Sequence, residues 1–419
     1  MDAVAPGADD ANVSALSLIR HPSFAVFWCA RTSTSGAYQM LLVAVGWQLY
    51  SLTNDPLDLG LVGLMQFVPM LALSLVIGQT VDHFDRRRIA GICQVAKALC
   101  AGTFALGTFR GWLSRDAVLL LVLLAGTARA FEAPAIGAIV PGLVPRSLLQ
   151  RAVAASATAQ QTAIICGPAL GGFLYLLGPA AVYAVCAATF VIAAILISLV
   201  GGSHRAADRK RVTLATMLAG FAYIRKNQVL LGAISLDLFA VLLGGVTALL
   251  PIYARDILGT GPWGLGLLRA APAVGALAMS VLLARYAIER RAGRLLFGTV
   301  CVFGLASAVF AVSTSLSLSF LALSVYGASD AISVVIRQSL VQTRTPHDML
   351  GRVMSVHSMF SGSSSTLGEF RAGALADWIG VVPSALIGGV GVIVVALCWM
   401  RVFPALRRVE HLSGEPVPA

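Results

Sequence analysis

Residues 57–88 read LDLGLVGLMQFVPMLALSLVIGQTVDHFDRRR, an apolar run that ends in three consecutive arginines. A membrane-spanning helix needs roughly 20 apolar residues, and the stretch from Leu57 to Gly78 supplies that length. Basic residues at the end of such a run are typical of its cytoplasmic side, because loops on that side carry an excess of Lys and Arg. The segment therefore predicts a spanning helix followed by a cytoplasmic loop.

The composition extends this interpretation to the whole chain. Of its 419 residues, 58% are apolar and only 12% are charged, whereas soluble domains have about 25% charged residues. One soluble core would not bury so much apolar surface, because exposed area grows with chain length. Polar breaks separate twelve apolar runs, at residues 24–50, 57–78, 89–109, 116–138, 153–176, 180–201, 229–253, 263–284, 294–314, 318–342, 353–376 and 381–403. We expect an all-α membrane protein with twelve transmembrane helices.

The distribution of basic residues predicts the orientation. Of the 30 Lys and Arg residues, 21 fall in loops on one side of the expected helices, three fall on the other side and six fall inside helices. The positive-inside rule places the first side in the cytoplasm. An even number of spans then places both termini there. This distribution explains the net charge of +11 without a nucleic-acid partner.

The sequence repeats at an offset of 201 residues, which predicts two similar halves. PRSLLQR at 145–151 resembles PHDMLGR at 346–352, and Gly167 and Gly172 fall on Gly368 and Gly373. Two pseudo-symmetric six-helix bundles are typical of secondary transporters, whose substrate site lies between the halves near the bilayer midplane. The expected domains are a cytoplasmic N-terminus (1–23), a first bundle (24–201), a cytoplasmic central loop (202–228), a second bundle (229–403) and a cytoplasmic tail (404–419).

The central loop has helical character. Apolar residues recur in it at helical spacing, at Leu214, Met217, Leu218, Phe221 and Ile224, and Arg225 and Lys226 follow. This pattern predicts a short amphipathic helix on the cytoplasmic face of the membrane. An ordinary linker with some helical content fits the pattern equally well.

About ten charged residues fall well inside the expected spans. The basic ones are Arg31, Lys97, Arg129, Arg269, Arg337 and Arg371, and the acidic ones are Glu132, Asp237, Asp330 and Glu369. Each costs at least ~2.5 kcal/mol at the bilayer centre, so we expect them to face a water-filled cavity or one another. Arg31 and Lys97 lie where they can also snorkel toward the interface.

The basic excess among these residues suggests an anionic or polar substrate. As candidates for the substrate cavity we take Arg31, Arg269, Arg337, Glu369 and Arg371.

Acidic residues among the ten are candidates for carrying a proton. Arg129 and Glu132 are three residues apart and share one helix face, so Glu132 is either a proton carrier tuned by Arg129 or one member of a static pair. Asp330 and Arg337 share a face in the same way. Asp237 has no partner nearby in sequence, so it either takes up a proton or pairs with an arginine of another helix. The candidates for proton coupling are Glu132, Arg129, Asp237 and Asp330.

The loop after the second span resembles a loop motif of the major facilitator superfamily, a Gly, an Asp four residues later and a basic cluster. Here the motif is supplied by Gly78, Asp82, Arg86, Arg87 and Arg88. The resemblance implies a gating loop whose charge pairs hold one conformation closed. Membrane anchoring by the arginines alone is the alternative. The family usually has Gly where this chain has Asp85, which puts the turn geometry there in question.

Two helices carry further partial matches to this superfamily. GPALGG at 167–172 resembles the end of its fifth-helix antiporter motif, with Gly167, Pro168, Gly171 and Gly172, although Ala163 replaces an upstream glycine. The resemblance leans toward export, and a simple packing kink is the alternative. RAFE at 129–132 resembles the fourth-helix motif whose Arg is linked to proton transfer, with Glu132-Ala133 where that motif has Gln-Gly.

Several stretches together resemble the enterobactin-exporter-like branch of the superfamily, namely HPSFAVFW at 21–28, VGWQLY at 45–50, LGRVMS at 350–355 and LGEFRAG at 367–373. The resemblance runs from about residue 20 to 400. It implies a multi-pass protein of the bacterial inner membrane that works as a monomer and exports a small organic molecule, a siderophore first of all, by proton-driven alternating access. A drug efflux pump, a lipid or solute importer and a non-transport receptor are the alternatives.

Other activities find no support in the sequence. There is no GxxxxGK[ST] nucleotide-binding loop and no hydrolase constellation, so we expect neither an enzyme nor a cofactor. The seven cysteines all lie in apolar stretches, where free Cys behaves as a small buried hydrophobe. We expect no disulfide and no metal site. The N-terminus lacks the basic and apolar regions of a cleavable signal peptide.

Overall fold

The computed structural model describes residues 21–201, 214–286 and 291–411, with a few side chains inside these ranges excepted. Within these ranges the chain forms helices and turns, and no strand occurs. The predicted all-α class is therefore confirmed. The terminal residues 1–20 and 412–419, and most of the central loop (202–213), lie outside the described residues.

The first half contains the spans up to residue 199. Their helices are α2 (Pro22–Thr53), α3 (Pro56–Ala72), α4 (Ser74–His83), α5 (Arg86–Arg110), α6 (Arg115–Ile139), α7 (Leu149–Leu174) and α8 (Pro179–Leu199), with short 3-10 turns at η2 (Val140–Gly142), η3 (Arg146–Leu148) and η4 (Tyr175–Leu177). Several spans begin on a local signal. Asp55 and Asp85, for example, accept hydrogen bonds from the backbone N–H of Leu57 and Arg87, which satisfies amides that have no partner inside the helix.

The second half begins with α9 (Leu214–Lys226). The spans that follow are formed by α10 (Gln228–Leu243), η5 (Val246–Leu249), α11 (Leu250–Ile252), the π-helix η6 (Tyr253–Ile257), α12 (Gly261–Arg285), α13 (Ala292–Val312), α14 (Leu316–Arg344), α15 (His347–Ile379), α16 (Val381–Val402) and the short α17 (Pro404–Arg407). The amphipathic stretch of the central loop is thus helical over 214–226, and its Ile224 is buried against the second half.

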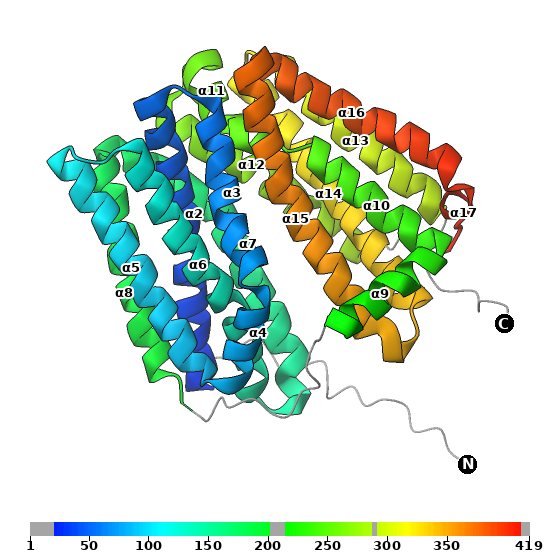
Figure 1. Cartoon of the computed structure of the whole chain (residues 1–419), viewed down its shortest axis with the longest axis horizontal. Coiled ribbons are helices and arrows are strands. Elements are labelled where there is room, and N and C mark those ends of the chain that lie inside the picture. Colours follow the sequence, from blue (N-terminus) through cyan, green and yellow to red (C-terminus); the bar gives the residue numbers. More distant parts are fainter. Residues whose placement is uncertain (1–20, 202–213, 287–290, 412–419) are drawn as a thin grey trace.

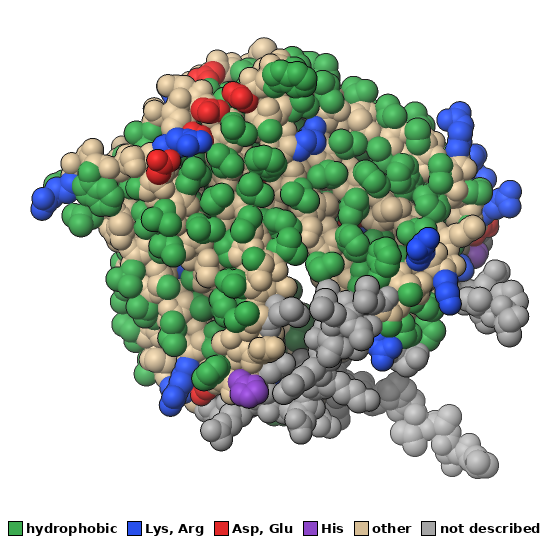
Figure 2. Space-filling model, in the orientation of Figure 1, with side chains coloured by type: hydrophobic (Ala, Val, Ile, Leu, Met, Phe, Trp, Pro, Cys, Tyr) green, Lys and Arg blue, Asp and Glu red, His purple; other side chains and the backbone are tan. Residues whose placement is uncertain are grey.

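Twelve spans can be traced through the described residues, when α3 with α4 and α10 through η6 are each counted as one. Eight of the described helices are long and apolar enough to cross a membrane by composition alone. Large apolar side chains cover the outer surface (Figure 2), among them Leu99, Ile192, Leu305 and Val394. Since exposed apolar surface on this scale is unfavourable in water, the surface fits a lipid environment.

The seventh span is not continuous, a feature the sequence pattern did not predict. Its backbone leaves the α-helix at Gly244 and Gly245. Arg371 of α15 donates hydrogen bonds to the carbonyl oxygens of Leu242 and Leu243, at 3.0 and 2.6 Å. A buried break in a membrane helix needs such partners, because freed carbonyl groups find no water in the bilayer.

The spans form two bundles that lie side by side (Figure 1). Residues related by the 201-residue offset occupy corresponding places in the two bundles. Gly167 packs on α2 and Gly368 packs on α10, each inside its own half. Gly172 and Gly373 instead face the opposite half, on α12 and α3. Equivalent glycines therefore make equivalent contacts, as pseudo-symmetric halves require.

The two halves meet at one end of the molecule, which we call the closed end. A Cβ on Gly172 would lie 2.5 Å from the carbonyl oxygen of Pro262, and one on Gly60 would lie 3.0 Å from that of Phe370. At the opposite end, called the open end, α4 packs on α6 of its own half and α9 packs on α10 and α15 of the other half. Figure 2 shows a hollow between the halves on this side.

Candidate functional site

A buried ion pair lies in the first half. Nζ of Lys97 on α5 is 2.5 Å from Oε2 of Glu132 on α6, and the two side chains are 1% and 7% exposed. Lys97 also donates to Thr34 of α2 at 2.8 Å, and Gln94 donates to Glu132. Three spans thus contribute to one polar cluster, which we call the Glu132 cluster (Thr34, Gln94, Lys97 and Glu132). Burial of a charge demands pairing of this kind.

The expected partner of Glu132 was wrong. Arg129 and Glu132 share a broad helix face, but the guanidinium of Arg129 lies over the ring of Tyr38, 4.2 Å from its centroid. Lys97, which was expected to be able to snorkel to the interface, is fully buried and takes the carboxylate instead. Arg129 remains exposed, and the Tyr38 hydroxyl beside it donates to Gln66 at 2.6 Å.

A second buried ion pair lies in the other half. Asp237 on α10 pairs with Arg337 on α14 at 2.8 Å, and both side chains are almost completely buried. Arg337 also donates to Ser333 at 2.6 Å, and Asp330 lies within electrostatic range of both charges. Of the two readings left open for Asp237, the structure therefore has the pairing with an arginine of another helix.

Two further expected residues, Glu369 and Arg269, lie where the halves meet, and a third, Arg371, lies within the second half. Glu369 on α15 accepts a hydrogen bond from Thr247 at 3.1 Å and interacts electrostatically with Arg269 on α12. The guanidinium of Arg269 in turn lies against Gly46 of α2 in the first half. Arg371 is occupied by the carbonyl groups at the break in the seventh span.

Arg31 lies near the Glu132 cluster. It is half-buried on α2 and within electrostatic range of Glu132. Its Nε has no hydrogen-bond partner among the described residues.

The expected gating loop contacts its own half. Arg86 donates to the carbonyl oxygen of Ala138 at 3.2 Å and Arg87 to that of Val200 at 2.6 Å. Asp85, where the family usually has Gly, caps the start of α5. Gly78 has open space around it, Arg88 is exposed, and the side chain of Asp82 lies outside the described residues.

The glycines of the fifth-helix motif pack against two different helices. Gly167 and Gly171 let α7 approach α2, whereas Gly172 lets it approach α12 across the closed end. Pro168 is buried within α7, and its carbonyl oxygen lies close to Gly266 of α12. Only glycine fits such close backbone contacts between helices.

Three polar contacts at the closed end were missed in the sequence. The Tyr50 hydroxyl on α2 donates to Asp256 on η6, while Arg255 donates to the Tyr50 carbonyl oxygen at 3.2 Å. Asp58 is fully buried and lies 2.5 Å from Arg115 within the first half. The signal available was the placement of Asp58 and Asp256 at the ends of apolar runs, beside residues assigned to loops.

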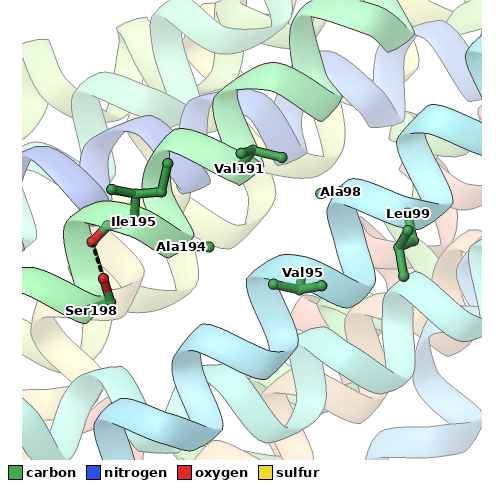
Figure 3. A pocket seen from close by; sticks show the side chains of 7 residues that line it. All are labelled: Val95, Ala98, Leu99, Val191, Ala194, Ile195 and Ser198. Atoms are coloured by element: carbon green, nitrogen blue, oxygen red, sulfur yellow. Dashed lines mark hydrogen bonds between the residues drawn. The ribbon is translucent and has the colours of Figure 1, made fainter.

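An apolar groove on the outer surface is unrelated to these clusters. Figure 3 shows its lining, which comes from α5 and α8 and includes Val95, Leu99, Val191 and Ile195. Its one polar side chain, Ser198, donates back to the carbonyl oxygen of Ile195. Among the described residues, no group of three or more His, Cys, Asp or Glu is placed to hold a metal ion.

Comparison with known proteins agrees with this architecture. A family model described as transmembrane secretion effector matches residues 13–417. This chain belongs to that family of the major facilitator superfamily. The family and the fold are those of membrane transporters rather than enzymes. The predicted family is therefore confirmed.

Relatives and solved structures of the superfamily cover nearly the whole chain. The enterobactin exporter EntS of Citrobacter koseri is 28% identical over 410 residues, 96% of this chain and 97% of that protein. EntS of Escherichia coli O81 is 26% identical over 400 residues, with 94% and 95% covered. A bacterial homologue of the human lysosomal transporter Spinster has a TM-score of 0.75 at 12% identity, with 95% and 99% covered. The nucleoside transporter NupG has 0.71 at 15%, with 91% and 99% covered. These structures share the major facilitator fold.

Proposed function

We propose that this transporter exports a small organic anion, a siderophore first of all, in exchange for protons. The open end is assigned to the cytoplasm, in keeping with the 21 basic residues in the loops on that side. The structure then corresponds to an inward-facing state, with substrate entering the hollow between the halves. Both halves that meet at the closed end belong to the same chain. We therefore propose that a monomer is sufficient for alternating access.

The Glu132 cluster carries the proposal. Glu132 and Lys97 form an ion pair with almost no exposure to solvent, and protonation of the carboxylate would remove half of that pair. We infer that protonation of Glu132 accompanies a conformation in which the two groups separate, because either charge alone would be left buried without its partner. A ligand shifts a two-state equilibrium by its differential affinity for the two states, and here that ligand is the proton.

The order of events follows from this preference. In the outward-facing state, a proton from outside neutralises Glu132. The return to the inward-facing state brings Lys97 back to the carboxylate and releases the proton to the cytoplasm. Asp237 pairs with Arg337 in the second half, and we treat it as the second candidate because fewer polar side chains surround that pair among the hydrogen bonds of the described residues.

The substrate class is proposed from unpaired arginines. Among the described residues, Arg31, Arg129 and Arg269 have no carboxylate within 4 Å. Arg129 is exposed and backed by an aromatic ring, a surface that suits a planar anion through ionic and stacking contacts. The relatives named enterobactin exporters support a siderophore as that anion.

The test uses the full chain in proteoliposomes that contain enterobactin, with an imposed pH gradient. Wild type should transport enterobactin when the pH gradient is imposed. Glu132→Gln should bind enterobactin but lose gradient-driven transport, whereas Asp237→Asn should retain it. Unchanged gradient-driven transport in Glu132→Gln would remove Glu132 as the carrier.

A drug efflux pump would give a different result in the same assay. Enterobactin would not be moved, while a cationic dye would be. That pattern would overturn the siderophore assignment and leave the proton cycle intact.

A further inference from the structure

Four arginines surround a cavity of about 350 Å³ at the open end of the second half, away from the hollow between the halves. Arg291 and Arg294 come from the start of α13, and Arg407 and Arg408 come from the end of α17. Glu410 is the one acidic residue in the lining. No described carboxylate lies within 4 Å of any of the four guanidinium groups.

The backbone holds this cluster together against charge repulsion. The N–H groups of Ala292 and Gly293 donate to the carbonyl oxygens of Glu410 and Val409, at 3.2 and 2.9 Å. A Cβ on Gly293 would lie only 2.0 Å from the carbonyl oxygen of Leu406, so α17 is packed tightly against the start of α13. The segment carrying Arg407 and Arg408 is therefore fixed beside Arg291 and Arg294.

Arg291 also has an unfavourable backbone conformation. Its φ is +58°, in the left-handed region that favours glycine. Such a conformation is unfavourable for a residue with a side chain and persists where the surrounding structure imposes it. Here the left-handed conformation occurs at the first of the four arginines that line the cavity.

The cavity lies at the level expected of lipid headgroups. The apolar span of α13 begins at Ala292, and that of α16 ends at Val402. Exposed apolar side chains continue from the cavity along the outer surface of both helices, among them Leu295, Val302 and Val402. Figure 2 shows basic side chains along the edge of the molecule near α17, next to this apolar surface.

We propose that the cavity binds the phosphate headgroup of an anionic phospholipid, with the acyl chains lying on α13 and α16. Guanidinium groups bind phosphate in a bidentate manner, and basic pockets at the cytoplasmic ends of spans suit anionic headgroups. A bound phosphate offsets the repulsion among the four arginines. The lipid thereby fastens α17 to α13.

The test is native mass spectrometry of the full chain in detergent with added phosphatidylglycerol or phosphatidylcholine. Wild type should retain one phosphatidylglycerol at least 10-fold more strongly than phosphatidylcholine. The double variant Arg294→Gln/Arg408→Gln should lose this preference. Arg285→Gln/Arg401→Gln removes the same charge at exposed positions outside the cavity and should keep it.

Three results would overturn the proposal. They are a preference that survives in Arg294→Gln/Arg408→Gln, a preference lost equally in the control variant, and the lack of a preference in wild type. Competition with inorganic phosphate is the last part of the test. Displacement of phosphatidylglycerol by millimolar phosphate would identify a site for soluble anions instead of lipid. Both variants should retain the thermal midpoint of wild type without added lipid, because all four substituted side chains are exposed.

Discussion

Lys97 and Glu132 come from neighbouring spans and form an ion pair of 2.5 Å that is almost completely buried. Thr34 connects this pair to a third span, since it receives a hydrogen bond from Lys97. The desolvation of two charges is compensated only while both are present. The pair is therefore sensitive to the loss of either charge, which is the property that proton coupling requires.

Loss of one charge should destabilise the protein more than loss of both. Lys97→Met leaves Glu132 buried without a cation and should lower stability by about 3 kcal/mol. Lys97→Met/Glu132→Gln should recover most of that loss. Thermal unfolding in detergent measures both. A double variant that is less stable than Lys97→Met would show that the two residues are not coupled.

The closed end should open more readily when the contact between Tyr50 and Asp256 is lost. Tyr50→Phe removes a hydrogen bond between α2 and η6 and should increase the population in which the halves separate there. Distances between spin labels at Ser51 and Thr314, both exposed, in a cysteine-free background, report that population.

Tyr253→Phe is the matched control for this measurement. The Tyr253 hydroxyl donates to Ala311 within the second half, at 2.8 Å, so its loss should leave the label distances unchanged. Equal distance distributions in Tyr50→Phe and wild type would show that the Tyr50 hydrogen bond does not hold the closed end together.

Closure should require glycine at position 172. Gly172→Val places methyl groups where the Pro262 carbonyl oxygen lies, so the halves could not meet at the closed end. Transport should fall at least 10-fold while expression is retained. Gly298→Val, on α13, has open space at its Cβ and should transport normally. Normal transport by Gly172→Val would rule out this interface as part of the cycle.

Arg129 should contribute to substrate affinity rather than to stability. It is exposed and has no acidic partner among the described residues, so Arg129→Gln should leave the thermal midpoint unchanged. The Kd for enterobactin should rise about 10-fold or more. Arg110→Gln, also exposed, serves as the charge-matched control. An equal rise in both variants would indicate a general electrostatic effect.

The spans were predictable because apolar length is a local property of the chain. All twelve expected runs overlap observed spans, and the ends differ by a few residues. The repeat at 201 residues also has a structural counterpart, since Gly172 and Gly373 contact opposite halves. The break in the seventh span was not predicted, because Gly244-Gly245 resembles ordinary small-residue packing until Arg371 is placed beside it.

The partners of the buried charges depend on tertiary packing. Spacing along one helix suggested Arg129 as the partner of Glu132. The structure instead pairs this carboxylate with a buried lysine from another helix, although Arg129 lies only three positions before it. Lys97 is 35 residues away from Glu132 in sequence. Asp237 and Arg337 are separated by 100 positions, so only the fold brings them together.

Proton movement driven by substrate tests the central claim most directly. Proteoliposomes with a pH-sensitive dye inside and no imposed gradient receive enterobactin on the side of the open end. Wild type should raise the internal pH because protons leave as enterobactin enters, whereas Glu132→Gln should bind enterobactin without any change in pH. A pH change of wild-type size in Glu132→Gln, or none in wild type despite enterobactin uptake, would contradict proton coupling through Glu132.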